Sequence, residues 1–224
     1  MESLSPLIAG YDTRLGRWMI SGANFGLRGW YFRAFRERHL PNIEDIPQEG
    51  DIVDAWCYTG SKMRSLLNRY SGRCIRWIDI NERALALASK RFTDTEVRFE
   101  QGDIRNLSDS VSGAALVFSS QVFHHLQQVD RLQALRSIHE SLRISGKLVI
   151  SDTFLDVANP FYRLLIAYYE QIAQCPYAIV MPDDLIEEAR SIGFKLNRVH
   201  HTIPGSRLWK KLWMYPSSML TFVK

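Results

Sequence analysis

The sequence has few cysteines, no long apolar run and no internal repeat. Its three cysteines, Cys57, Cys74 and Cys175, are scattered and fit neither a disulfide framework nor a zinc site with paired ligands. No stretch has the apolar length of a membrane span, and the N-terminus lacks the basic-then-apolar pattern of a signal peptide. These absences predict a protein of the reducing cytoplasm.

Charge of one sign is also not in large excess. The chain has 28 Lys and Arg against 24 Asp and Glu, which gives a formal net charge of +4. A mildly basic balance permits an anionic surface as a partner, and it gives no indication of nucleic acid binding.

The composition is that of a globular protein, with 46% hydrophobic and 23% charged residues. A chain of 224 residues buries one large core and leaves little for a second. We therefore expect a single domain over residues 1–224 and leave the oligomeric state open.

The most informative stretch is the turn after the first expected strand. A short apolar run at residues 52–53 ends in Asp54, and a tight turn continues to Gly60. Apolar residues then recur at helical spacing over residues 63–67. Strand, turn and helix open a nucleotide-binding βαβ unit, in which the ligand lies over the strand's carboxyl end and the helix N-terminus.

A second acid follows Asp54 at a spacing that is typical of nucleotide-binding sites. The strand expected at residues 73–79 ends in Asp79, 25 residues after Asp54. This is close to the spacing at which a carboxylate binds both ribose hydroxyls in βαβ nucleotide sites. Its two oxygens can accept from two vicinal hydroxyl donors. The alternative is a strand-end acid or a cap for the helix near Asn81.

The rest of the chain continues the alternation of strands and helices. An almost wholly apolar strand at residues 114–120 is typical of a central parallel strand covered on both faces. Further strands are expected at residues 96–104, 145–152, 195–203 and 219–223, the last two antiparallel, with helices at residues 131–143 and 182–192.

The turn Asp54-Ala55-Trp56-Cys57-Tyr58-Thr59-Gly60 resembles motif I of the class I S-adenosylmethionine (SAM) methyltransferases. In that motif glycines usually stand where this chain has Trp56 and Tyr58. The strand at residues 114–120, followed by His124-His125-Leu126, is similar to the later segment of small-molecule SAM methyltransferases. More loosely, Tyr11-Asp12 and the following Gly26 and Trp30 resemble the quinone-ring C-methyltransferases of menaquinone and ubiquinone biosynthesis.

The resemblance implies an α/β, Rossmann-like methyltransferase fold. Its sheet would be mostly parallel and seven-stranded, with an antiparallel last strand. Residues 1–45 would form an N-terminal helical cap, and residues 155–181 a helical insertion over the substrate site.

The resemblance also implies SAM as the cofactor. The residues that would bind it are Asp54, Trp56, Cys57, Tyr58, Gly60, Asp79, Ile80, Asp103, Ile104 and Ser119. In this family the acid at the position of Asp103 accepts a hydrogen bond from the adenine amino group.

Two aromatic residues, Tyr58 and Trp56, stand in the turn where the motif usually has glycines. Catechol O-methyltransferases are similar in carrying tyrosine at the position of Tyr58, where its ring lies by the sulfonium. Cation–π attraction between the ring and the sulfonium favours this arrangement. Tyr58 is therefore a catalytic candidate. Glycine at the position of Trp56 would let backbone and ligand approach closely. The indole of Trp56 is expected either to fill the methionine pocket or to turn into the core.

His124 and His125 are the candidates for proton transfer, because an imidazole titrates near neutrality. They follow a strand at the rim where acceptor substrates lie. As successive residues they are expected to point in different directions, so that at most one faces the substrate. The alternative is a rim histidine with a purely structural role. No metal site is predicted: Asp152 could join a divalent site, but partner acids are not evident.

These expectations combine into SAM-dependent methyl transfer to a small hydrophobic acceptor, aromatic or quinone-like. Aromatic residues in residues 1–40 and 155–181 would line an apolar pocket. With arginines in the first segment and the basic residues 207–215, they could also contact an anionic membrane peripherally. The alternatives are a non-methylating enzyme on this fold, such as a cyclase, and a binding or scaffolding pseudoenzyme.

Overall fold

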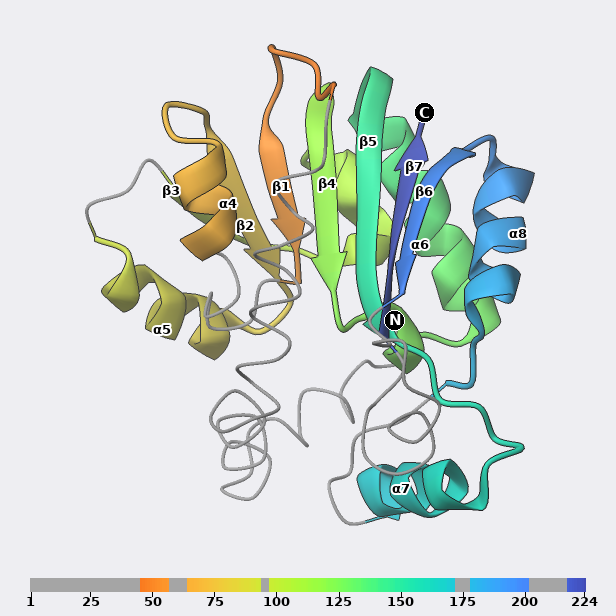
Figure 1. Ribbon diagram of the computed structural model, residues 1–224. Coiled ribbons are helices and arrows are strands. Elements are labelled where there is room, and N and C mark those ends of the chain that lie inside the picture. The colour runs from red at the N-terminus through yellow and green to blue at the C-terminus, as the bar shows by residue number, and fades with distance from the viewer. Residues whose placement is uncertain (1–44, 57–63, 94–96, 172–177, 202–216) are drawn as a thin grey trace.

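The computed structural model describes residues 45–56, 64–93, 97–171, 178–201 and 217–224 (Figure 1). The expected N-terminal cap lies outside the described residues except for its last residue. So do residues 172–177 of the expected insertion.

Seven strands form one sheet. They are β1 (Ile52–Ala55), β2 (Ile75–Asp79), β3 (Val97–Gln101), β4 (Ala114–Ser120), β5 (Leu142–Thr153), β6 (Lys195–His201) and β7 (Ser217–Val223). The α-helices of the described residues are α4 (Arg64–Arg69), α5 (Glu82–Arg91), α6 (Gln128–Ser141), α7 (Pro160–Gln171) and α8 (Pro182–Ile192). Two 3₁₀ helices, η2 (Ile104–Asp109) and η3 (Phe123–His125), follow β3 and β4.

The strand order is β3-β2-β1-β4-β5-β7-β6. β1 pairs in parallel with β2 on one side and with β4 on the other. β7 is antiparallel to both β5 and β6. The predicted fold, a mostly parallel seven-stranded sheet with an antiparallel last strand, is confirmed.

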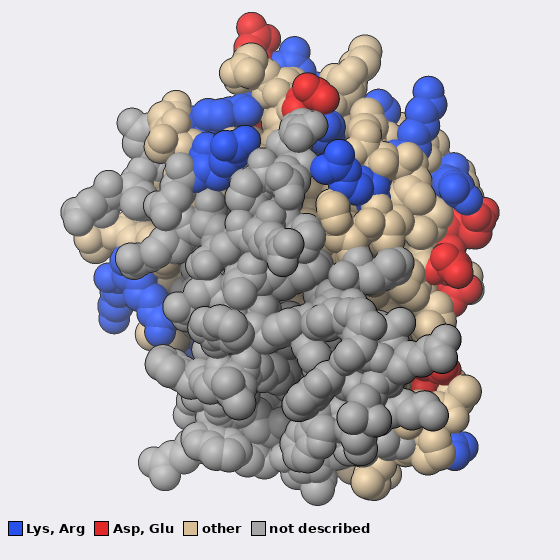
Figure 2. All heavy atoms as spheres, in the orientation of Figure 1, with Lys and Arg blue, Asp and Glu red and all other residues tan. Residues whose placement is uncertain are grey.

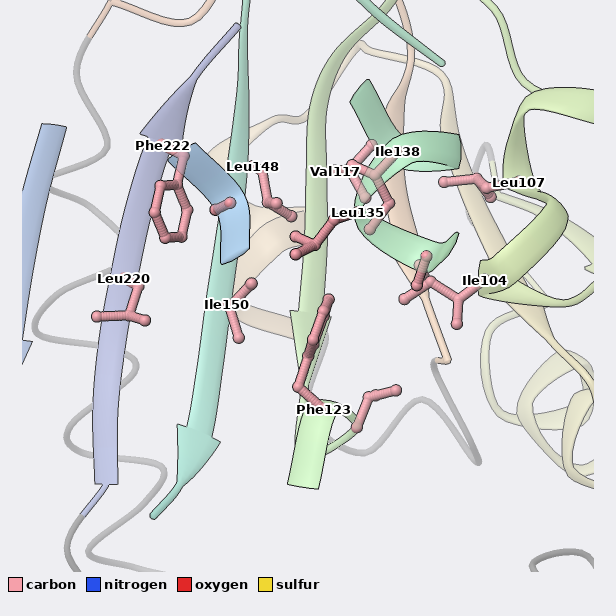
Figure 3. Packing of buried hydrophobic residues seen from close by; sticks show 14 of the residues in the cluster. Ile104, Leu107, Val117, Phe123, Leu135, Ile138, Leu148, Ile150, Leu220 and Phe222 are labelled. Carbon is pink, nitrogen blue, oxygen red and sulfur yellow. The ribbon is translucent and has the colours of Figure 1, made fainter. Parts of the chain in front are cut away.

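Alternation along the strands builds two cores, because successive side chains point to opposite faces of a sheet. Val53, Val117 and Leu148 belong to the larger cluster, which also contains residues of α6 and α8 and which we call the α6-face core. Figure 3 shows part of it, with Phe222 and Leu220 of β7 beside Leu148 and Ile150 of β5. Ile52, Leu116 and Val149 point the other way, to the cluster formed with α4 and α5.

One predicted boundary was wrong. The helix expected at residues 131–143 ends at Ser141, and β5 begins at Leu142 rather than after a turn at residue 145. Ser145 has φ +65°, and the β4–β5 pairing shifts register between Ala114 and Leu116. The expected turn is therefore an irregularity within the strand.

Gly146 shows why this irregularity needs a glycine. A Cβ there would lie 2.8 Å from the Arg143 carbonyl oxygen and 2.9 Å from the Ala114 carbonyl oxygen. Both are closer than a carbon atom can approach without movement of the backbone.

The finding on membrane-crossing helices holds for the described residues. Among them, none of the helices combines the length and the apolar character needed to span a bilayer.

Candidate functional site

The crevice where a ligand is expected lies at the carboxyl ends of β1 and β4. The chain order of the strands reverses there: β2 and β3 lie on one side of β1, and β4 and β5 on the other. In open α/β sheets this switch point is where ligands bind. Ala55, the last residue of β1, is in register with Ile78 of β2 and with Ser119 of β4.

Trp56 is the first residue after β1, and its backbone has the conformation that glycine favours. Its φ is +75°, and its N–H donates to the Ile78 carbonyl oxygen at 2.6 Å. The indole is partly buried and packs against the α6-face core. The turn thus keeps a glycine-type backbone although it carries a large side chain, at a cost of about 1–2 kcal/mol. Of the two positions expected for the indole, contact with the core is the one observed.

The other residues predicted for this turn are Cys57, Tyr58 and Gly60. All three lie outside the described residues, so their roles stay predictions.

Asp54 and Asp79 are both buried, with 2% and 1% of their surface exposed. One oxygen of Asp79, Oδ1, accepts the N–H of Asn81 at 2.8 Å. The capping role belongs to Asn81 instead, whose side chain accepts the Ala84 N–H at 3.1 Å and caps α5. Asp79 is therefore held at the end of β2 and next to β1. The adjoining Ile80 carbonyl oxygen accepts from the Gln101 side chain at 3.2 Å.

Asp103 follows β3 and is engaged by Arg105. Both carboxylate oxygens accept from the Arg105 guanidinium, at 2.7 to 3.2 Å, and Oδ1 also accepts the Arg105 N–H at 2.9 Å. The hydrogen bond to Asp103, aided by Asp130, raises the pKa of Arg105 although burial lowers it. A contact from Asp103 to an adenine amino group stays a prediction, and such a donor would have to share the carboxylate with Arg105. The next residue, Ile104, is buried in the α6-face core.

Two buried hydroxyls lie at the carboxyl end of β4. Ser119 and Ser120 are 1% and 6% exposed, and neither Oγ has a hydrogen-bond partner in the described structure. Leaving a buried polar group unsatisfied costs roughly 1–3 kcal/mol. A polar ligand at the switch point could satisfy one of them, so the residues present fit a cofactor that carries hydroxyl, amino and carboxylate groups. Ser119 was predicted from the sequence; Ser120 was not.

His124 and His125 lie in η3, immediately after β4, and each is 8% exposed. Their ring centroids are 3.9 Å apart with an interplanar angle of 47°. The expectation that the two rings point apart is therefore wrong, because the rings contact each other. His124 Nδ1 makes a very short contact with Asp152 Oδ1.

Asp152, near the end of β5, was missed as a partner of His124. The sequence indicated this acid only as a possible metal ligand. Its carboxylate is fully buried and accepts the backbone N–H groups of the turn after β4. Burial alone would raise the pKa of Asp152, but the charge and hydrogen bond of His124 and the Thr153 N–H outweigh it, so the pKa lies below its ordinary value. The available signal was an acid at the end of one strand and histidines after its parallel neighbour.

A buried ion pair contacts the chain just after η3. Arg131 of α6 donates to both carboxylate oxygens of Glu188 in α8, at 2.9 and 2.7 Å. Its third contact, from Nη1, is to the Leu126 carbonyl oxygen at 2.9 Å, one residue after η3. A shallow hollow of about 400 Å³ beside this pair is lined by Gln127, Ile179 and neighbouring residues.

Part of the chain is similar in sequence to known methyltransferases. Residues 52–146 match the family model described as a methyltransferase domain. An uncharacterized methyltransferase of Bacillus cytotoxicus is 28% identical over 121 residues, which are 51% of this chain and 53% of that protein. The chain therefore spans about half the length of this curated relative.

Solved structures share the fold at low identity. Magnesium protoporphyrin IX methyltransferase from Synechocystis, solved with bound S-adenosylhomocysteine (SAH), has a TM-score of 0.73 and 14% identity, over 99% of this chain and 100% of that one. A SAM-dependent methyltransferase of Methanosarcina mazei has a TM-score of 0.66 and 15% identity, over 82% and 97%. The cyclopropane synthase MmaA2 of Mycobacterium tuberculosis has a TM-score of 0.68 and 11% identity, over 85% and 84%.

Proposed function

Because residues 52–146 match a family model described as a methyltransferase domain, we propose that this chain is a class I SAM-dependent methyltransferase and that it transfers the SAM methyl group to a small hydrophobic acceptor with an aromatic or quinone-like ring. The observation that carries the proposal is Asp79, a buried acid held at the end of β2 beside the switch point. This is where a carboxylate can bind the ribose of a nucleotide cofactor.

The cofactor brings its own electrophilic methyl group when bound, so the chain has to position the two reactants and handle a proton. Asp79 would bind the ribose hydroxyls. Ser119 or Ser120 would offer a hydroxyl to a polar group of the cofactor. His124 or His125 would take the proton that the acceptor loses.

Apolar side chains at the carboxyl side of the sheet support a hydrophobic acceptor. α7 lies beyond the carboxyl end of β5 (Figure 1). Its Tyr162 packs against the buried pair Leu155 and Ile166, whereas Leu164 is 70% exposed. Apolar and aromatic linings with few polar groups favour flat hydrophobic ligands. The aromatic residues at positions 1–40 belong to the same proposal and lie outside the described residues.

We also propose peripheral contact with an anionic membrane, because a lipid-soluble acceptor would have to be reached there. Many described lysines and arginines visible in Figure 2 lie toward the amino ends of the strands. The proposal therefore depends on the basic and aromatic residues 1–40 and 207–215, outside the described part of the chain. Co-sedimentation with vesicles of anionic lipid at low salt should retain the protein, and vesicles of neutral lipid should not.

Calorimetry with SAH tests the cofactor site. Asp79→Asn should weaken SAH binding by about ten- to a hundredfold, because a charge-assisted acceptor contributes about 1.5–3 kcal/mol. Asp109→Asn makes the same chemical change on an exposed acid at the end of η2 and should leave the affinity as it is. An Asp79→Asn variant that binds SAH as well as the wild type would remove the assignment; a wild type that binds no SAH would remove the function.

A further inference from the structure

Asp152 is a carboxylate with a fixed orientation. Its Oδ2 accepts three backbone N–H groups of the turn after β4, those of Val122, Phe123 and His124, at 3.2, 2.7 and 3.3 Å. Its Oδ1 accepts the Thr153 N–H at 2.7 Å and contacts His124 Nδ1. Bonds to both oxygens, at a side chain with 0% exposure, prevent the carboxylate from rotating.

This contact decides which nitrogen of His124 carries the proton. The pKa of Asp152 lies below its ordinary value, so the carboxyl group is ionised near neutral pH. An ionised carboxylate only accepts hydrogen bonds, so the nitrogen that faces it, Nδ1, has to be the protonated one. In the neutral ring the lone pair is then on Nε2.

The turn that carries His124 is fixed to the sheet. Gln121, with φ +62°, donates its N–H to the Ser151 carbonyl oxygen at 2.9 Å, and its side chain accepts from the Thr153 hydroxyl at 2.9 Å. The Ala178 N–H donates to the His124 carbonyl oxygen at 2.7 Å. His124 is thereby held in the turn that follows β4, the strand whose last two residues are the buried Ser119 and Ser120.

We infer that Asp152 is a positioning residue that fixes His124, and not His125, as the proton acceptor of this enzyme, an inference that rests on the proposed function. The acceptor atom forms a bond to the methyl carbon with loss of the methyl–sulfur bond, whose electron pair stays on sulfur. The proton of the acceptor passes to Nε2 of His124, and the resulting imidazolium is stabilised by the Asp152 carboxylate. His124 returns the proton to solvent after the product leaves.

In the described part of the chain, two titratable groups contact the His124 ring. They are Asp152 from β5 and His125 from η3. Asp152→Asn keeps the size of the side chain and one of its two acceptor oxygens, which can keep the three backbone hydrogen bonds of Oδ2. It replaces the oxygen that faces His124 with an uncharged amide nitrogen. Asp156→Asn is the matched control, because it makes the same change four residues further on at an exposed side chain.

The first measurement is the tautomer of His124 by ¹⁵N NMR of the full-length protein, which needs no acceptor. In the wild type and in Asp156→Asn we expect the neutral ring to be protonated on Nδ1, and in Asp152→Asn we expect this preference to be lost. A wild-type ring protonated on Nε2 would overturn the inference.

The second measurement is a double-mutant cycle on turnover, with 1,4-naphthohydroquinone as the probe acceptor and labelled SAM. Asp152→Asn and His124→Gln should each lower kcat by about a hundredfold or more, with little change in KM. The double variant should lose no more than His124→Gln alone, because Asp152 acts only through His124. The kcat–pH profile of the wild type should have an ascending limb that His124→Gln removes.

His125→Gln should retain most of the turnover. The inference is overturned if His125→Gln loses as much as His124→Gln, or if the losses of Asp152→Asn and His124→Gln multiply. SAH affinity is measured on the same variants and should not change. Failure of the wild type to bind SAH would instead count against the proposed function, and the NMR result would still decide the state of His124.

Discussion

The turn at Trp56 makes a prediction about protein stability that does not depend on any ligand. We consider two substitutions, Trp56→Ala and Trp56→Gly. Both remove the partly buried indole and its contact with the α6-face core, so both should be less stable than the wild type. The difference between them isolates the backbone.

The magnitude follows from the φ of +75° at this residue. A residue with a Cβ pays about 1–2 kcal/mol in the left-handed region, and glycine does not. Glycine loses more chain entropy on folding than alanine, by about 0.5–1 kcal/mol. The net result is that Trp56→Gly should be more stable than Trp56→Ala by about 0.5–1 kcal/mol.

The neighbouring residue provides the control. Ala55 is in β1, has no exposed surface and has no positive φ. Ala55→Gly should therefore cost about 1–2 kcal/mol, from the entropy of glycine and the loss of a buried methyl group. The sign of the alanine-to-glycine change should reverse between two adjacent residues.

Urea unfolding of the three variants, followed by circular dichroism, measures these free energies. If Trp56→Ala is as stable as Trp56→Gly or more so, then the residue does not have a glycine-type backbone. In that case the correspondence between this turn and the family's first glycine has no conformational basis.

Three further predictions concern the same site. The folded-state pKa of Asp152 is depressed, so its stabilising contribution is fully present above its unfolded pKa of about 3.9 and is lost as the pH falls through the lower folded value. When the free energy of unfolding is measured from about pH 6 downward, it should therefore decrease once the pH is below about 4. The decrease should be less steep in Asp152→Asn. Arg131→Met should cost about 3–5 kcal/mol by leaving Glu188 buried without its partner, whereas Arg131→Met with Glu188→Leu should recover most of that loss in thermal unfolding. Ser119→Ala should leave the ligand-free protein as stable or up to about 1 kcal/mol more stable, because it removes an unsatisfied hydroxyl; weaker SAH binding by the same variant in calorimetry would show that the cofactor uses this group, and unchanged binding would show that it does not.

The sheet could be predicted from the sequence because each strand carries its own signal. The apolar run of β4 and the acid that ends β2 are local features, and their order along the chain is enough to imply a parallel sheet. The adjacency of the carboxyl ends of β1 and β2 then follows from the fold. For this reason Asp79 was predicted where it lies.

The contact between His124 and Asp152 could not be predicted in this way. The two residues come from different strand ends, and their contact depends on the register that sets Ser120 opposite Ser151. A shift of one residue would turn Asp152 to the other face of the sheet. The conformation of Trp56 was equally hidden, because a tryptophan gives no local signal for a positive φ.

The contact between Asp103 and Arg105 also had no signal in the sequence. Arg105 stands two residues after Asp103, at the start of η2, and its guanidinium donates to the carboxylate that was predicted to contact adenine.

The position of β7 has a consequence for how the chain folds during synthesis. β7 lies between β5 and β6 in the sheet but follows both in the sequence, and among the described strands β6 pairs only with β7. Before residues 217–223 have been synthesised, β6 lacks its partner strand β7, and the edge of β5 that pairs with β7 is exposed. An open edge of that kind can recruit a strand from another nascent chain. We therefore expect that stalled or truncated chains lacking β7 aggregate, and that the slow step of folding is the insertion of this strand between two others.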